Sequence, residues 1–323
     1  MPKYISFIPL LVLVLVGAGC QQTTSPVSKS PTAVILDTAA QKFCSPDNKI
    51  IDHQVKQSFN SYCLVPVSTE PLVSEKAQNY SFTILNNFGK TVENFSVAHE
   101  KLMHIVLMNN SLGEFQHLHP EYDPNTSVFT IKDVIFPSDG EYLIYLDFLA
   151  EADEENRGIM IPQLIAEKLT VGKSDNTAPQ KLTVDTLDKN STSITKNVDR
   201  YKVAMGSIKE PLIHLTRYTD NKFSFTVDDV DGKKINPLEK YLGTYGHLVI
   251  IHEGTHQYIH AHPLETGTVN SMEFDVKFPL PGTYKLFFQF QHDGTVHRTE
   301  YVVSVGTGTT VPLPKEAMDH SNH

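Results

Sequence analysis

The sequence predicts an all-β protein built from two tandem antiparallel β-sandwich domains, of immunoglobulin-like or cupredoxin-like type. Three observations predict this fold class. The chain contains an internal duplication. Short segments rich in β-branched and aromatic residues recur in both halves, separated by Gly, Pro, Asn and Asp. Beyond the first 20 residues, no stretch sustains the 3.6-residue periodicity of an amphipathic helix.

The duplication is visible as matching segments at a constant offset. The pairs separated by 143 positions are Ser81–Ile84 with Ser224–Val227, Gly89-Lys90 with Gly232-Lys233, His104–Val106 with His247–Val249, and His117–Pro120 with His260–Pro263. One deletion in the second copy then aligns Phe136-Pro137 with Phe278-Pro279 and Gly140 with Gly282. Self-similarity over this length indicates two copies of one domain.

The predicted strands divide the chain into regions. Those of the first copy are 79–85, 102–108, 127–134, 141–148 and 163–171, and those of the second are 223–227, 247–252, 257–261, 272–278, 283–290 and 298–305. We therefore expect a first sandwich at 41–173, a linker at 174–199, a second sandwich at 200–306 and a disordered tail bearing His and Met at 307–323. The polar segment after the first sandwich is expected to contain one more strand, near 181–187, and 201–205 to open the second sandwich.

The N-terminus predicts export. A basic start precedes an apolar run over 4–16, which is too short to span a bilayer and is typical of a secretory signal. Small residues Gly17-Ala18-Gly19 lead into Cys20, and this pattern resembles the lipobox of bacterial lipoproteins, apart from Gly17 at a position that is usually aliphatic. The resemblance implies a signal peptide at 1–19, lipidation of Cys20 and anchoring to the outer face of the bacterial membrane. An ordinary signal peptide is the alternative.

The segment that follows suits an extracytoplasmic protein. Residues 20–40 include a Ser-, Thr- and Pro-containing polar stretch and are expected to form a flexible tether. Cys44 and Cys63 are the remaining cysteines, and an oxidising exterior favours a disulfide between them. That bond would close a loop of about 20 residues and contribute roughly 3 kcal/mol.

Composition and motifs argue against two function classes. The formal net charge is −10, with dispersed acidic residues, so a nucleic-acid partner is not expected. The chain contains no Gly-x-Ser-x-Gly elbow, no Walker-type glycine loop and no His-Glu-x-x-His helix. We therefore expect a protein that is not an enzyme.

Each copy carries the same histidine pattern, in which one His is followed 13 and 15 residues later by His-x-His-Pro. In the second copy, Glu253-Gly254 suits a two-residue hairpin turn. That register would place His247 directly opposite His260, with His262 two residues along and therefore on the same face. The same register in the first copy would place His104 opposite His117, with His119 alongside.

Three imidazoles on one hairpin are a plausible site for copper, or less favourably for zinc. Met103 and Met108 lie near His104 and could add a soft ligand to the first copy, with Met108 on the same face as His104. The competing interpretation is structural, with imidazoles bonded to the backbone and Pro ending the strand. Imidazole nitrogens within about 4 Å of one another, with an open approach, would favour a metal, because metal–nitrogen bonds are about 2 Å long. Rings that point apart into packed surroundings would favour the structural interpretation.

Other histidines give weaker signals. His99 has no counterpart in the second copy, where Leu242 occupies its place. His292 and His297 bracket the Asp293-Gly294 turn, where a secondary site is conceivable.

Three segments of the second copy together resemble a known motif set: Tyr241–Val249 (YLGTYGHLV), Tyr258–Pro263 (YIHAHP) and Phe287–Phe290 (FFQF). This set is similar to one in largely uncharacterised bacterial secreted proteins associated with extracytoplasmic metal handling, especially of copper. The first copy departs from it at Ser96–Met103. The resemblance implies a metal-handling role for the second copy and assigns no catalytic residue.

Two hypotheses follow. In the first, a lipid-anchored protein captures or delivers copper through His104, His117 and His119 and through His247, His260 and His262. In the second, the tandem domains form an interaction module for another envelope protein, the histidines are structural, and an exposed apolar patch marks the partner surface.

Overall fold

A computed structural model describes residues 62–86, 88–151, 158–173, 180–187, 192–207, 215–235, 237–265 and 270–307. The described residues form seventeen β-strands and no helix, which confirms the all-β class. Within this part of the chain, no helix is long and apolar enough to cross a membrane. The predicted signal peptide, Cys20, the tether, Cys44 and all but the first residue of the predicted tail lie outside the described residues.

The first copy folds into two antiparallel sheets that face each other. One sheet has the strand order β1 (Cys63–Pro66), β2 (Gln78–Leu85), β7 (Val128–Val134), β6 (Glu121–Asp123). The other has the order β3 (Phe95–Ser96), β8 (Gly140–Glu151), β4 (Met103–Asn109), β5 (Gln116–Leu118), and β9 (Met160–Val171) pairs along β8. Between them lies a core that includes the fully buried Phe82, Ile105 and Ile144.

The second copy repeats this architecture. One sheet has the order β10 (Ser193–Val198), β11 (Tyr201–Ser207), β12 (Asn221–Asp229), β15 (Ser271–Val276). The other has the order β14 (Tyr258–Ala261), β13 (His247–His252), β16 (Gly282–His292), β17 (Thr295–Val305). The run β5-β4-β8-β9 of the first copy thus corresponds to β14-β13-β16-β17 of the second, as a duplication requires.

Two expectations about the connection between the sandwiches were wrong. The segment 181–187 is not a strand. It lies beside β17 instead, where the Asp185 backbone amide donates to the carbonyl of Val302 at 2.9 Å and the Val302 amide donates to the Asp185 carboxylate at 2.8 Å. Strand β10 lies inside the predicted linker 174–199, so the second sandwich begins before residue 200.

The alternation along β4 and β13 shows that both of these strands are buried on two sides. Ile105 and Leu107 of β4 point into the core of the first sandwich, whereas Val106 and Met108 belong to a separate apolar cluster. The equivalent residues of β13 in that same cluster are Val249 and Ile251. Because other sheets cover both faces of β4, its residues are buried without interruption from Met103 to Met108.

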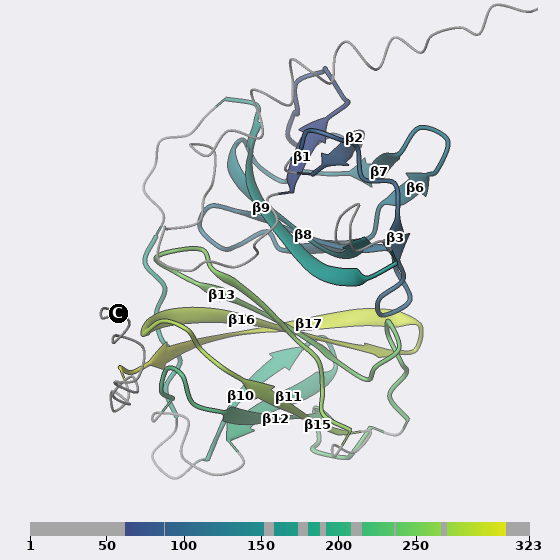
Figure 1. Cartoon of the computed structure of the whole chain (residues 1–323). Coiled ribbons are helices and arrows are strands. Elements are labelled where there is room, and N and C mark those ends of the chain that lie inside the picture. The colour runs from purple at the N-terminus through teal and green to yellow at the C-terminus, as the bar shows by residue number, and fades with distance from the viewer. Residues whose placement is uncertain are drawn as a thin grey trace, which may run out of the picture.

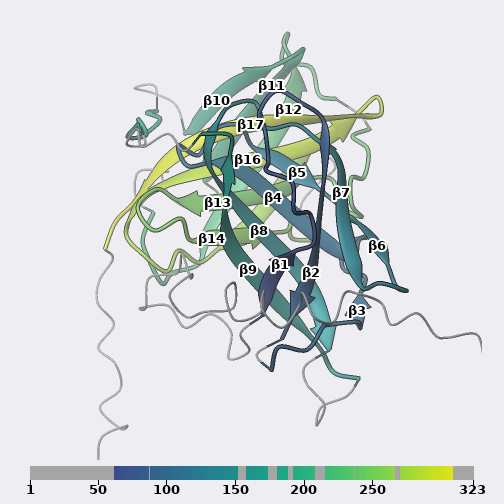
Figure 2. The ribbon, with the colours of Figure 1, turned by 90° about the horizontal axis from the view of Figure 1, so that it is seen from above.

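This third cluster joins the two domains. Figure 1 shows the sheet with β8 and β9 lying against the sheet with β13, β16 and β17, so that the four sheets form a stack, and Figure 2 shows these two inner sheets overlapping when viewed from above. Phe115 stacks on Phe287 with ring centroids 4.3 Å apart, and Tyr145 stacks on Tyr258 at 5.0 Å. The duplication exchanges the two pairs, because Phe115 corresponds to Tyr258 and Tyr145 to Phe287. The copies are therefore packed with approximate two-fold symmetry.

Only one cysteine of the predicted disulfide, Cys63, lies in the described part of the chain. Cys63 is buried at the start of β1. Cys44 lies outside the described residues. The pairing of the two cysteines therefore stays a prediction.

Candidate metal centre at the domain interface

The β13–β14 hairpin positions the histidines of the second copy, but not in the predicted register. Leu248 pairs with Ala261 and Val249 with His260, so His247 lies across from His262 rather than His260. The connection is a four-residue loop and not the predicted two-residue turn, since the backbone amide of His252 donates to the carbonyl of Gln257 at 2.9 Å. His256, with a φ of 55°, takes the left-handed position in this loop.

The first copy shows the same shift. Ile105 pairs with Leu118 and Val106 with His117, so His104 lies across from His119 and the predicted opposition of His104 and His117 was wrong. In both copies the observed cross-strand partner lies two residues from the predicted one. A shift of two keeps every side chain on its predicted face, because side chains alternate with a period of two. The histidines therefore still converge.

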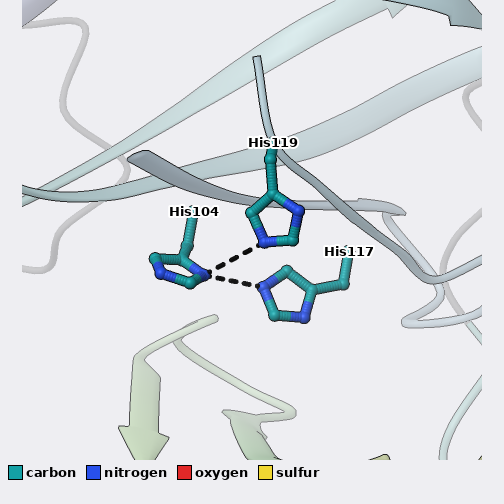
Figure 3. A group of neighbouring side chains, drawn as sticks. All are labelled: His104, His117 and His119. Carbon is teal, nitrogen blue, oxygen red and sulfur yellow. Dashed lines mark hydrogen bonds between the residues drawn. The ribbon is translucent and has the colours of Figure 1, made fainter. Parts of the chain in front are cut away.

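In each copy the three histidines form a compact group: His104, His117 and His119 in site 1, and His247, His260 and His262 in site 2. One nitrogen from each member lies within 4.8 Å of the others. In site 1, His104 Nδ1 lies 3.2 Å from His117 Nε2 and 3.2 Å from His119 Nε2, as Figure 3 shows. These separations fall inside the range that favours a metal site.

The outward nitrogen of the first histidine in each site is bonded to a backbone carbonyl. His104 Nε2 donates to the carbonyl of Ala98 at 3.0 Å, and His247 Nε2 donates to the carbonyl of Tyr241 at 2.8 Å. The two carbonyls occupy equivalent positions, 143 residues apart. Because a carbonyl only accepts, the proton resides on Nε2, and the inward Nδ1 carries a lone pair.

The second histidine of each site is oriented by the other domain. His260 Nδ1 donates to the carboxylate of Asp147 at 2.9 Å, and His117 Nδ1 donates to the amide oxygen of Gln289 at 2.8 Å. Asp147 and Gln289 are themselves equivalent, paired with His104 and with His247 on neighbouring strands. The inward Nε2 of each middle histidine is thereby left with its lone pair.

The inward nitrogens of the first and middle histidines therefore face one another with a lone pair on each, whereas His119 Nε2 lies 3.2 Å from His104 Nδ1, within hydrogen-bonding distance. In site 2, His247 Nδ1, His260 Nε2 and His262 Nε2 are buried and have no hydrogen-bond partner. In site 1, the same atoms of His104 and His117 approach to 3.2 Å with a lone pair on each. A buried acceptor without a partner costs about 1–3 kcal/mol, and a cation at the centre of each group would satisfy all three nitrogens.

Burial lowers the pKa of five of the six site histidines. Burial lowers the pKa of His104 to about 4 and that of His247 to about 3, and it holds the pKa of His117 well below its ordinary range. Burial, followed by repulsion from neighbouring histidines, lowers the pKa of His119 to about 3 and that of His262 to about 2. Neutral imidazole is the form that ligates a metal, so near pH 7 these five donors need not lose a proton before binding.

The two sites adjoin each other across the interface. The ring of His260 in site 2 lies 5.7 Å from that of His104 and 6.2 Å from that of His117, measured between centroids. His99, which is exposed, stacks on His262 with centroids 3.7 Å apart. The sequence therefore predicted two separate groups, whereas the fold joins them into one cluster between the domains.

Methionine does not join this cluster. Met103 packs in the core of the first sandwich, and Met108 packs in the apolar cluster between the domains, with both side chains fully buried. The soft ligand considered for the first copy is therefore not provided by either residue. The observed donor set is imidazole alone.

Sequence reasoning missed Asp147, Gln289 and the position of His99. A signal was present for the first two, since Asp147 is the only charged residue in the apolar run Leu143–Phe148, and Gln289 interrupts the equivalent run Leu286–Phe290. A polar residue within a buried strand needs a partner. That partner lies in the other domain, so the sequence could not identify it.

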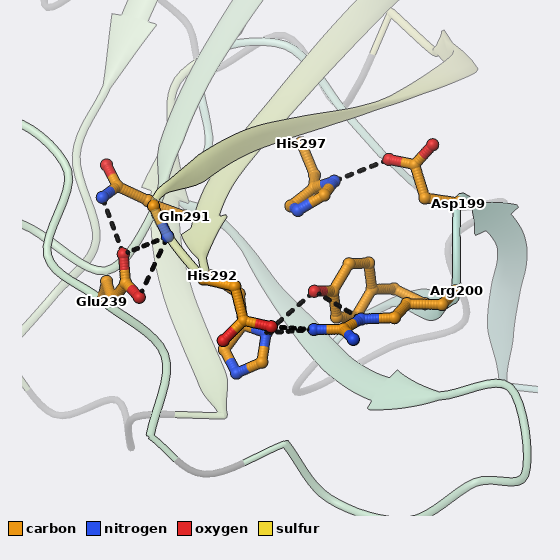
Figure 4. A network of polar contacts seen from close by, with 9 residues as sticks. Asp199, Arg200, Glu239, Gln291, His292 and His297 are labelled. Atoms are coloured by element: carbon orange, nitrogen blue, oxygen red, sulfur yellow. Dashed lines mark hydrogen bonds and ion pairs between the residues drawn. The ribbon is translucent and has the colours of Figure 1, made fainter.

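His292 and His297 have a structural role at the end of the β16–β17 hairpin. Figure 4 shows them in a polar network with Asp199 and Arg200. His297 Nδ1 donates to Asp199 at 2.6 Å, and His292 Nδ1 is bonded to the Tyr201 hydroxyl at 2.8 Å. Each ring thus has its own partner, and neither histidine belongs to a three-residue group of the described chain.

Comparison with known proteins identifies the family. Residues 62–158 and 196–307 match a domain of unknown function, DUF8832, which together is well over half of the chain. The chain therefore belongs to this uncharacterised family, and both copies contribute to the match. No curated protein matches it.

Solved structures offer only remote likenesses. The S-layer protein rSbsC(31-844) has 12% identity and a TM-score of 0.23, over 77% of this chain and 28% of that one. Escherichia coli alpha-2-macroglobulin activated by porcine elastase has 10% identity and a TM-score of 0.24, over 77% and 24%. A marsupial T cell receptor has 9% identity and a TM-score of 0.20, over 79% and 75%. This chain thus spans about a quarter of the length of the first two, and likeness at these TM-scores carries no information on function.

Proposed function

We propose that this protein is a lipid-anchored extracytoplasmic protein that captures or delivers transition-metal ions through site 1 and site 2. The observation that carries the proposal is the convergence of three imidazole nitrogens within 4.8 Å in each copy, with the outward nitrogens of His104, His117, His247 and His260 held by acceptors. Lipidation of Cys20 would tether the domains to the outer face of the membrane.

The hydrogen-bond pattern favours ligands over structural histidines. A structural histidine gains stability when both of its nitrogens have partners. In site 2 the outward nitrogens of His247 and His260 are satisfied and their inward nitrogens are not. This is the pattern of a metal ligand whose other nitrogen is bonded to a carboxylate or carbonyl that sets its tautomer and orientation. In site 1 the outward nitrogens of His104 and His117 are held in the same way.

Copper is the ion proposed, with zinc as the competitor. Imidazole suits both metals, and a nitrogen site generally binds divalent copper more tightly than zinc. Three protein ligands leave one position open in a tetrahedral site, which suits transfer of the ion to or from another molecule. The proposed role is capture or delivery without catalysis.

The direct test is a titration of the purified full chain with Cu(II), Cu(I) and Zn(II), followed by calorimetry. We expect saturable binding of two equivalents beyond the binding of a variant in which all six site histidines are alanine, since that variant reports any contribution of the tail. His260→Ala/His262→Ala should remove one equivalent. His256→Ala, which removes a histidine of the same hairpin from outside both sites, should remove none.

Binding of no more metal than the six-alanine variant would refute the proposal. The interaction-module hypothesis would then gain weight, and the search would turn to an envelope protein that is retained equally by the native chain and by the six-alanine variant. If zinc bound more tightly than copper, the two proposed sites would stand and the proposed ion would be zinc.

A further inference from the structure

The two sites differ in the charge that the opposite domain brings to them. What this difference implies for metal binding rests on the proposed function, because it concerns the same two sites. Asp147 of the first copy reaches His260 of site 2, and Gln289 of the second copy reaches His117 of site 1. At equivalent positions of a near-symmetric interface, one middle histidine therefore faces a carboxylate and the other faces a neutral amide.

Both contacts are shielded enough to influence a bound ion. The side chain of His260 is 6% exposed and that of Asp147 is 31% exposed, while Gln289 is 7% exposed. Within the described residues, the carboxylate of Asp147 is hydrogen-bonded to His260 and forms no salt bridge with a Lys or Arg, so no cation of this part of the chain compensates its charge. An acceptor that is hydrogen-bonded to a ligating imidazole raises the basicity of the ligand and fixes its orientation. A charged carboxylate raises the basicity more than a neutral amide does.

A second difference acts on the same site. His99 of the first copy stacks on His262 of site 2 and is exposed to solvent. Its equivalent, Leu242, is buried and brings no donor to site 1. An additional imidazole therefore lies at the edge of site 2, where an incoming ion can meet it.

We propose that site 2 is the tighter of the two metal sites and fills first, and that Asp147 sets this order from the opposite domain. Loss of a partner of this kind changes metal affinity by about 10–100-fold, which is the expected ratio between the sites. Asp147 is a positioning and charge-setting residue and not a ligand, since the inward ligand atoms are all imidazole nitrogens. The interface between the copies is thus part of the metal site.

The experiment uses the full chain with one site removed at a time. His117→Ala/His119→Ala leaves site 2, and His260→Ala/His262→Ala leaves site 1. The Kd of each for Cu(II) is measured by competition with a chelator of known affinity, with circular dichroism to verify folding. We expect site 2 to bind about 10–100-fold more tightly than site 1. Asp147→Asn, which retains the shape and an acceptor oxygen, should remove most of this difference and bring site 2 to within about fivefold of site 1, the margin that His99 supplies.

A reciprocal arm keeps the test decisive if Asp147→Asn does not fold. Gln289→Glu in the chain with site 1 alone should tighten Cu(II) binding, whereas the same change in the chain with site 2 alone should not tighten it comparably. Equal affinities, or an unchanged affinity in Asp147→Asn together with an unchanged affinity in Gln289→Glu, would overturn this inference and leave the proposed function standing. Absence of binding in every variant would instead overturn the proposed function.

Discussion

Site 1 and site 2 have the same donors, the same inward nitrogens and the same backbone anchor, yet their surroundings have diverged at three equivalent positions. Gln289 faces site 1 where Asp147 faces site 2, Leu242 stands where the first copy has His99, and Tyr241 stands where it has Ala98. The preserved set is the one a metal would contact, and the divergent set adjusts charge and access. The comparison teaches that the three-histidine geometry was retained in both copies while the charge and the side chains around it changed.

The largest effect should come from removing the donors themselves. His104→Ala/His119→Ala should abolish binding at site 1 and leave one equivalent at site 2, because a single remaining imidazole cannot hold the ion. Inductively coupled plasma mass spectrometry after gel filtration gives the stoichiometry. Retention of two equivalents would show that His104 and His119 are not needed for binding and would contradict the assignment of site 1.

The apolar contacts between the copies should make the next largest difference. Phe287→Ala removes a fully buried ring stacked on Phe115, and we expect it to lower the free energy of unfolding by about 3–5 kcal/mol. Urea denaturation checks the value. The control is Tyr145→Phe, which keeps the ring in the equivalent position but removes the 2.7 Å hydrogen bond from its hydroxyl to the carbonyl of His256 and should cost about 1 kcal/mol. Equal effects of the two changes would contradict a packed interface.

Acid should destabilise the metal-free protein through both sites. Burial holds the pKa of His104 at about 4 and that of His247 at about 3, whereas the unfolded chain has ordinary values near 6.5. Below pH 6.5 the unfolded state therefore binds more protons than the folded state, so the free energy of unfolding falls as the pH drops from about 6.5 towards 4 and is unaffected by these groups at higher pH. Urea midpoints between pH 7.5 and 4.5 test this.

The matched variant for the acid experiment is His104→Leu/His247→Leu, which cannot gain these protons. Its midpoint should depend less on pH than that of the native chain over the same window. A native midpoint that does not fall on acidification would contradict the neutral state of the buried imidazoles.

The smallest effect should come from His99. His99→Leu introduces the residue that the other copy has at this position and removes the stack on His262. An aromatic pair of this kind contributes about 0.5–1 kcal/mol, which corresponds to roughly a twofold to fivefold loss of affinity at site 2. Competition titration resolves such a change, and site 1 serves as the internal control. A loss as large as that expected for Asp147→Asn would identify His99 as a ligand.

Much of the fold was predictable because its signals are local. The strand-rich halves and the 143-residue offset are present in the sequence, and period-two alternation determines which side chains share a face of β4 or β13. The identity of the six site histidines followed from the same alternation. The grouping of these histidines was predicted correctly although each hairpin register was wrong by two residues, because a shift of two leaves every side chain on the same face.

The sequence by itself determined the duplication, the all-β class and the convergence of three imidazoles in each copy. Only the tertiary structure decided the four-residue loop after β13, the additional strand β10 and the contact between the two domains. The reason is physical, since alternation is a property of each strand, whereas docking depends on how two whole surfaces fit. The partners of His117 and His260 lie 172 and 113 residues away in the chain, and it is domain packing that brings them together.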